Sequence, residues 1–149
     1  MVKHYSNFNI QKKYKGSIIL IGNFDGLHQG HQKLFKLAQS YKKKYNLKIG
    51  VINFDPMPKM FFNKKLKNFR LSNVQQKIKL LSKFKVDFVI TKKFDKKFSK
   101  TKASNFVTQI LNKKLRSKFI FVSNNFRFGN KREGNVDLLK KYEKLLNYK

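Results

Sequence analysis

Residues 17–31 read SIILIGNFDGLHQGH, and this stretch decides the fold class that the sequence predicts. Its first part, 17–21, is a short apolar run bounded by turn residues, which is typical of a buried β-strand. Beyond His31, apolar side chains recur at helical spacing as far as Tyr45, so we expect a helix that begins near His31. A buried strand followed at once by a helix is the first half of a βαβ unit.

The same alternation continues along the chain. Short apolar runs predict three further strands, at residues 49–54, 88–91 and 119–122. Helical spacing predicts three further helices, within residues 72–84, 103–111 and 135–146. Ser72 and Gln75 have capping-box spacing, and Asn135 is the expected N-cap of the last helix. The segment 60–69 fits neither period and is expected to be a long loop. This order predicts an α/β fold with a doubly wound, mainly parallel sheet.

The length of 149 residues fits one domain, residues 1–149. The sequence contains no cysteine, which excludes a disulfide framework, a thiolate metal site and a cysteine nucleophile. Because it has no run of about 18 apolar residues, we expect a soluble, cytoplasmic protein that binds no membrane. The oligomeric state stays open.

The formal net charge is +29, and 32 of the 36 basic residues are lysine. Such a charge favours a polyanionic partner such as nucleic acid. The chain is also rich in Phe, Tyr, Ile and Asn, as A- and T-rich codons dictate, so the second interpretation is a surface made basic by codon usage. Since the sequence has no RNP, KH, helix-turn-helix or zinc-finger pattern, we expect no specific nucleic-acid partner.

The loop after the first strand carries two imidazoles, His28 and His31, at the start of a helix. Backbone N–H groups and the helix dipole favour a phosphate at such a place, and two imidazole N–H donors suit phosphoryl chemistry. Glycines at 22, 26 and 30 let the backbone approach a ligand closely. A zinc site is disfavoured, since His4 is the only other histidine. Helix capping by either histidine and turn capping by Asp25 remain alternatives.

Two further loops carry aromatic or basic residues. In NFDPMPKMFF, residues 53–62, Pro56 and Pro58 stiffen the chain beside a cluster of phenylalanines, which offers an apolar wall to a flat ring or simply seals the sheet edge. In VSNNFRFGNKREG, residues 122–134, phenylalanines alternate with basic residues such as Arg127. Arginine suits planar phosphate recognition, although a charged loop over a helix end is the alternative.

GNFDGLHQGH resembles the GxFDxxHxGH signature of the HxGH nucleotidyltransferases, which have a Rossmann-like fold. Three more segments, NFDPMPKMFF, QKIKLLSKFKVDFVI and SNNFRFGNKREGNVDLL, follow in order. Together the four resemble the N-terminal FMN adenylyltransferase module of bifunctional riboflavin kinase/FAD synthetases. The resemblance extends from about Ser17 to Tyr142 and implies transfer of AMP from ATP to FMN, with FAD and pyrophosphate as products.

The resemblance also implies roles for particular residues. His28 and His31 would hold the ATP phosphates and stabilise the transferring α-phosphate, and Mg²⁺ would bridge those phosphates. The other residues implied for ATP are Gly22, Asn23, Phe24, Asp25, Gly30, Asn125 and Arg127. Those implied for the flavin are Phe54, Pro56, Pro58, Phe62, Phe106, Asn125 and Phe128.

The sequence also departs from the family pattern. Met57 stands where the family has a histidine between two prolines, and Ser123 stands where it has a glycine. The family's SSTxIR phosphate-binding segment and its riboflavin kinase domain have no counterpart here, so we expect a module truncated before that segment. Two alternatives therefore accompany FAD synthesis: a non-catalytic remnant that binds nucleotide or flavin, and a nucleotidyltransferase with another phosphate acceptor.

Overall fold

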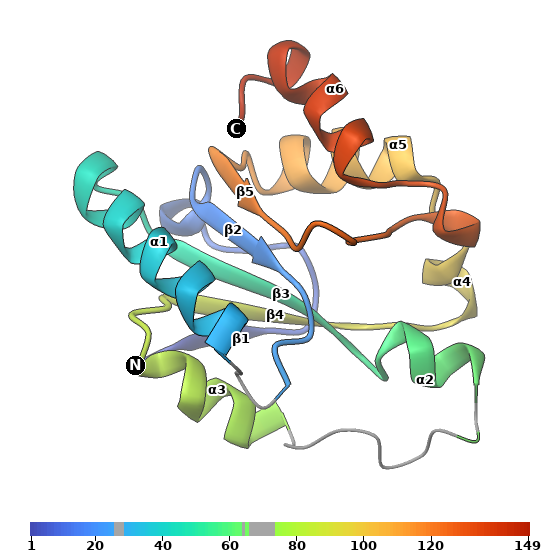
Figure 1. Cartoon of the computed structure of the whole chain (residues 1–149), viewed down its shortest axis with the longest axis horizontal. Coiled ribbons are helices and arrows are strands. Elements are labelled where there is room, and N and C mark those ends of the chain that lie inside the picture. Colours follow the sequence, from blue (N-terminus) through green and yellow to red (C-terminus); the bar gives the residue numbers. More distant parts are fainter. Residues whose placement is uncertain (26–28, 64, 66–73) are drawn as a thin grey trace.

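The computed structural model describes residues 1–25, 29–63, 65 and 74–149. Its centre is a five-stranded sheet in the order β1-β4-β3-β2-β5, and all four strand pairs are parallel (Figure 1). The strands are β1 (Lys3–Tyr5), β2 (Ile18–Ile21), β3 (Ile49–Asp55), β4 (Phe88–Lys93) and β5 (Phe119–Phe121). The α/β class with a parallel sheet is therefore confirmed, and the sequence analysis missed only β1 among these strands.

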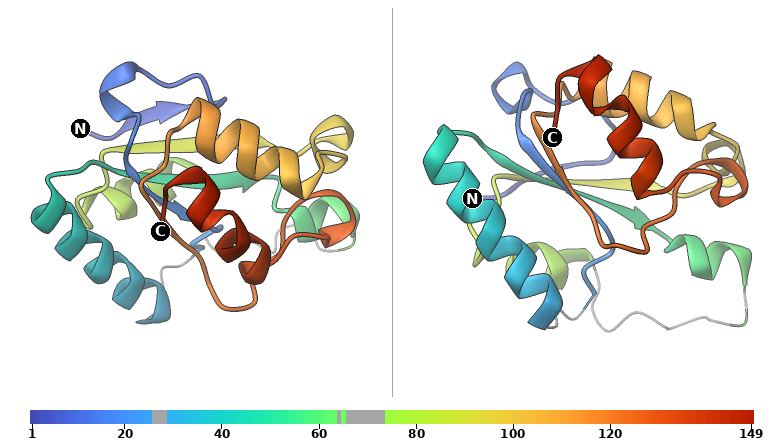
Figure 2. Two further views of the ribbon diagram at one scale, coloured as in Figure 1. Left: turned by 90° about the horizontal axis from the view of Figure 1, so that it is seen from above. Right: turned by 45° about the horizontal axis from the view of Figure 1, so that its top comes forward.

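Helices cover both faces of the sheet (Figure 2). The α-helices are α1 (Gln29–Tyr45), α2 (Pro58–Phe62), α3 (Val74–Ser82), α4 (Lys96–Ser99), α5 (Ala103–Asn105) and α6 (Val136–Leu146). The π-helix η3 (Phe106–Lys114) continues α5, and η1 (Lys12–Tyr14) and η4 (Asn130–Arg132) are short 3₁₀-helices. Residues of α1 and α3 share one apolar core with the sheet, and residues of η3 and α6 share the other.

Alternation along the strands separates the two cores. On β2, Ile18 and Leu20 join the core under α1 and α3, while Ile19 and Ile21 join the core under η3 and α6. All four side chains are at most 2% exposed. Successive residues of a strand point to opposite faces, so a strand covered on both faces is a continuous apolar run.

Most predicted element boundaries agree with the structure. The first helix begins at Gln29, two residues before His31. The Asn135 cap of α6 is confirmed, because its side-chain oxygen accepts a hydrogen bond of 2.9 Å from the Leu138 N–H. Ser72 lies outside the described residues.

The prediction of a long loop over residues 60–69 is wrong for its first residues, because residues 60–62 belong to α2. Pro58 is the first residue of this helix, and the fixed φ of proline favours that position. The five-residue helix is too short to show a helical period in the sequence.

Candidate functional site

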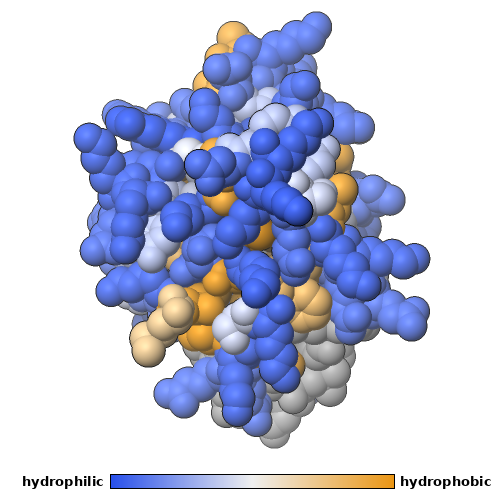
Figure 3. Space-filling model, turned by 90° about the vertical axis from the view of Figure 1, so that its left-hand side faces the viewer, coloured by the Kyte–Doolittle hydropathy of each residue, from blue (hydrophilic) through white to orange (hydrophobic). Residues whose placement is uncertain are grey.

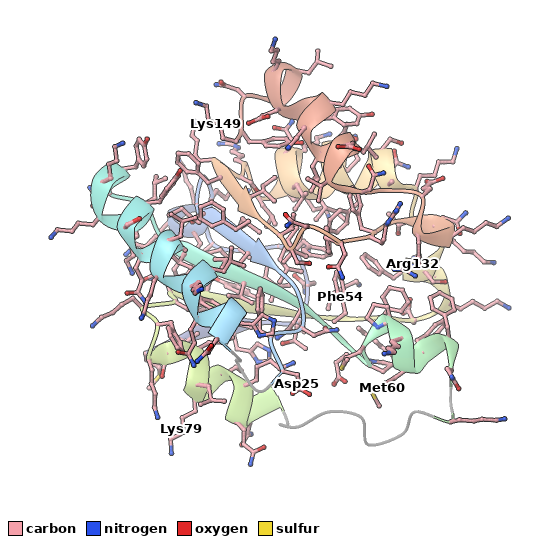
Figure 4. All side chains as sticks on the ribbon, viewed as in Figure 1. Asp25, Phe54, Met60, Lys79, Arg132 and Lys149 are labelled. Carbon is pink, nitrogen blue, oxygen red and sulfur yellow. The ribbon has the colours of Figure 1, made fainter. Side chains whose placement is uncertain are left out.

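A cavity of about 740 Å³ opens where β2 and β3 end and the loops after them begin. Figure 4 shows Phe54 at the end of β3 and Arg132 of η4 on this same side of the molecule. Eight residues that the sequence analysis assigned to the two substrates line the cavity. They are Gly22, Asn23 and Arg127 for ATP, and Phe54, Pro58, Phe62, Phe106 and Phe128 for the flavin.

Phe94 joins the aromatic side chains on one wall of the cavity. Its ring centroid lies 5.3–5.9 Å from those of Phe54, Phe61, Phe62 and Phe98, in edge-to-face contacts. The Phe62 side chain is 66% exposed at the rim, an unusual exposure for a large apolar group. Phe94 and Phe98 were missed in the sequence analysis. Both follow β4, and examining the loop after every strand would have found them.

The opposite wall is formed by residues 122–134. The Phe126 and Phe128 rings are stacked, with centroids 5.4 Å apart and planes 18° apart. Phe128 also lies 5.4 Å from Phe106, whose side chain is 3% exposed. Both groups of rings line the same cavity of about 740 Å³, which leaves room for a flat aromatic ligand.

Gly129 fixes this second wall against α5. Its φ is +81°, and an added Cβ would lie 2.7 Å from the backbone of Ala103. The Glu133 carboxylate accepts a 2.9 Å hydrogen bond from the Ala103 N–H, and Phe128 forms an antiparallel bridge with Gly134. The loop therefore returns to the start of α5 and holds its phenylalanines in place.

The loop after β2 begins at the other end of the cavity. Phe24 is only 4% exposed, and its ring lies 5.0 Å from Phe35 and 5.1 Å from the His31 ring. Phe24 thus positions the His31 imidazole, which is half-buried at the beginning of α1. His28 lies outside the described residues.

Two carboxamide oxygens near this loop are buried. The side-chain oxygens of Asn23 and Asn53 have no hydrogen-bond partner within the described parts of the chain. Such oxygens are costly to bury unless a donor reaches them, by about 1–3 kcal/mol each. Asn23 lines the cavity, while Asn53 precedes Phe54 on β3 and points to the α1 side.

Other predicted residues lie at or outside the rim. Asn125 is exposed, and its side-chain oxygen accepts a 2.9 Å hydrogen bond from the Ser123 hydroxyl. Neither Asn125 nor Pro56 lines the cavity. Asp25 is half-buried and Gly30 is exposed in the first turn of α1.

The charge on the cavity wall is positive. Lys59, Arg127 and Arg132 line it, which favours an anionic ligand. Among the residues that the structure describes, no group of three or more His, Cys, Asp or Glu side chains could hold a metal ion. In the same part of the chain, no helix is long and apolar enough to cross a membrane.

The residues that line the cavity lie within a segment that matches a known protein family. The FAD synthetase family model matches residues 10–149, nearly the whole chain and both walls of the cavity. The chain belongs to the FAD synthetase family.

Curated relatives of this FAD synthetase-family chain are bifunctional. The riboflavin kinase/FMN adenylyltransferase of Buchnera aphidicola subsp. Schizaphis graminum is 42% identical over 141 residues, which are 95% of this chain and 45% of that protein. The Escherichia coli K12 protein of the same description is 39% identical over 131 residues, which are 88% and 42% of the two chains. The chain thus spans less than half the length of these relatives.

Solved structures of other proteins have folds similar to the fold of this chain. A protein of Streptococcus pneumoniae described as a macrolide-efflux protein has a TM-score of 0.82 at 25% identity, over 95% of this chain and 55% of that one. The pantoate-β-alanine ligase of Francisella tularensis has a TM-score of 0.59 at 17% identity, over 100% of this chain and 65% of the ligase. The latter likeness concerns the fold alone.

Proposed function

We propose that this chain transfers the AMP group of ATP to the phosphate of FMN and releases pyrophosphate. The observation that carries the proposal is the cavity itself. Residues expected to contact ATP and residues expected to contact the flavin line one continuous space at the carboxyl ends of the strands. Parallel α/β sheets bind their ligands at this edge.

The aromatic walls suit the isoalloxazine ring of FMN. Phe62, Phe94, Phe126 and Phe128 all line the cavity, with Phe62 in contact with Phe94 and Phe126 stacked on Phe128. A flat tricyclic ring between them would bury apolar area on both faces, and each aromatic contact adds about 0.5–1.5 kcal/mol. The phosphate of FMN would then extend toward the end of the cavity that contains Gly22 and Asn23.

The reaction would occur beside the loop after β2. An FMN phosphate oxygen attacks the α-phosphorus of ATP, the new P–O bond forms, and the bond to the bridging oxygen of pyrophosphate breaks. Negative charge increases on the phosphoryl oxygens in the transition state. The imidazole of His31, held by Phe24, and that of His28 would donate hydrogen bonds to this charge, while Arg127 would bind the phosphates.

The residues present fit a Mg²⁺ ion that ATP carries rather than one that the protein cages. The described residues offer no cluster of acidic side chains for it. Mg²⁺ binds commonly through substrate phosphates with few protein ligands. When bound, the ion would neutralise phosphate charge, and the side chains of this site would orient the two substrates.

The test incubates the purified chain with FMN, MgATP and pyrophosphatase. Chromatography then measures the FAD that is formed. We expect product from the wild-type chain and a loss of at least about 100-fold in kcat for His31→Ala. His4→Ala is the matched control, because His4 lies on edge strand β1 and not in the cavity.

Two results would contradict FAD synthesis. Binding of FMN or ATP without any product would identify a remnant that binds without turnover. Turnover with a different phosphate acceptor, in place of FMN, would identify another nucleotidyltransferase.

A further inference from the structure

Positive charge on this molecule is not confined to the cavity. Hydrophilic side chains cover most of the face that Figure 3 shows, and the whole chain has a formal net charge of +29. A cationic surface attracts phosphate-bearing ligands of many kinds, so charge alone does not select FMN among them. Selection therefore depends on the neutral polar groups that the cavity presents to a ligand.

Asn23 offers such a group where β2 passes into the loop that follows it. Its side-chain oxygen is buried and has no hydrogen-bond partner in the parts of the chain that the structure describes. The charged side chains that line the same cavity, Lys59, Arg127 and Arg132, are hydrogen-bond donors only. They suit the phosphate and carbonyl oxygens of a ligand, whereas the Asn23 oxygen suits a hydroxyl or an amine.

The neighbours of Asn23 in the chain are both held in place. The Gly22 N–H donates a 3.1 Å hydrogen bond to the Ile52 carbonyl of β3. The Phe24 ring is 4% exposed in the core under α1 and α3, and Phe24 has a φ of +52°, which is costly for an aromatic residue. A backbone shift that brought a donor to the Asn23 oxygen would therefore break one of these contacts.

The buried oxygen of Asn23 destabilises the free chain, because an acceptor without a donor has lost its hydrogen bonds to water. A ligand that supplies the donor recovers this loss on binding, and an analogue that lacks the donor does not. In FMN, the isoalloxazine ring would lie among the phenylalanines, and the phosphate carries mainly acceptor oxygens. The ribityl chain that joins the two carries hydroxyl donors.

We propose that Asn23 determines specificity for the ribityl chain of the flavin: its side-chain oxygen accepts a hydrogen bond from a ribityl hydroxyl of FMN. The inference rests on the proposed function, and it assigns Asn23 to the flavin rather than to ATP. A hydroxyl at this place leaves the adjoining phosphate of FMN beside the loop where AMP transfer would occur. A flavin whose phosphate is carried on a chain without hydroxyls is then a poor ligand.

The experiment compares FMN with an analogue that carries its phosphate on a pentyl chain in place of the ribityl chain. Quenching of flavin fluorescence by the whole protein chain measures both Kd values. The test variant is Asn23→Leu, which keeps the size of the side chain, removes the oxygen and needs no positive φ. Asn112→Leu is the matched control, because Asn112 is also half-buried but lies on η3 outside the cavity. Asn23→Ala repeats the comparison with a smaller side chain.

We expect Asn23→Leu to raise the Kd for FMN at least about fivefold and to change the Kd for the analogue less than about twofold. The wild type should prefer FMN to the analogue, and the variant should lose most of this preference. The urea midpoint of the free variant should equal or exceed that of the wild type, because an apolar side chain replaces a buried oxygen without a partner. Asn112→Leu should leave both Kd values unchanged.

Several results would overturn the role of Asn23. They are an unchanged Kd for FMN, equal losses for FMN and the analogue, or a loss of affinity for ATP in isothermal titration that exceeds the loss for FMN. Equal losses together with a lower urea midpoint would identify a purely structural residue. A wild-type chain that binds neither flavin would refute the proposed function as well, whereas one that binds FMN and fails the comparison refutes only the role of Asn23.

Discussion

Phe94→Leu tests the aromatic wall most directly. The Phe94 ring makes edge-to-face contacts with Phe54, Phe61, Phe62 and Phe98 at 5.9, 5.3, 5.9 and 5.7 Å. Leucine retains the apolar character and removes all four ring contacts. At about 0.5 kcal/mol for each contact, the free energy of unfolding should fall by about 2 kcal/mol.

The same change should weaken FMN binding. One wall of the cavity loses its central ring, and a loss of about 1.4 kcal/mol in the binding free energy raises the Kd about tenfold. Quenching of flavin fluorescence measures this Kd, and urea unfolding measures the stability.

Phe84→Leu is the matched control. Phe84 is also half-buried, but its ring lies 5.4 Å from Phe35 in the core under α1, away from the cavity. We expect it to lose stability without changing the Kd for FMN. If Phe94→Leu binds FMN within twofold of the wild type, the aromatic wall is not the flavin site and the reasoning fails.

Three further predictions concern stability. Gly129→Ala should lower the free energy of unfolding by about 1–3 kcal/mol more than Gly16→Ala does. Both glycines have φ +81°, but of the two only Gly129 has a backbone 2.7 Å from the new Cβ. Equal losses in the two variants would contradict the close approach. Burial raises the pKa of Tyr148 to about 12. The stability that the neutral Tyr148 side chain contributes is therefore complete below pH 10 and is lost as the pH rises toward 12. A Tyr148→Phe variant should lack this loss when unfolding is measured as a function of pH. A hydrogen bond from the Phe98 N–H lowers the pKa of Asp95. The stability that ionised Asp95 contributes is therefore present above about pH 4 and is lost in more acid solution. Asp95→Asn, which still caps α4, should show a smaller loss of stability in acid.

Local patterns predicted most of the fold. Strands β2 to β5 are apolar runs because both faces of the sheet are covered, and that burial is visible in the sequence itself. Strand β1, with the sequence KHY, has no such signal. It forms because β4 offers a free edge, and Lys3, His4 and Tyr5 pair with residues 88–90 of β4. Backbone pairing at an edge depends on the partner rather than on side-chain type.

The candidate site, like the sheet, was predictable from the sequence only in part. The loop after β2 and the Phe-rich loops after β3 and β5 were predictable, because glycines, prolines and alternating aromatic and basic residues mark them in one stretch each. Phe94 and Phe98 follow β4 and would have been found by examining that loop too, although neither stands out by itself because phenylalanine is abundant in this chain. Their contacts with Phe54 join residues about 40 positions apart along the chain.

By itself, the sequence determined the class of fold, the order of strands β2 to β5 and the residue types in the loops that follow β2, β3 and β5, because burial and backbone preferences act locally. Only the tertiary structure decided which loops share a cavity. The shared cavity follows from the parallel sheet, which brings all strand ends to one edge. Residues distant in the sequence thereby meet at one edge, where phenylalanines and the basic side chains of Lys59, Arg127 and Arg132 line one cavity.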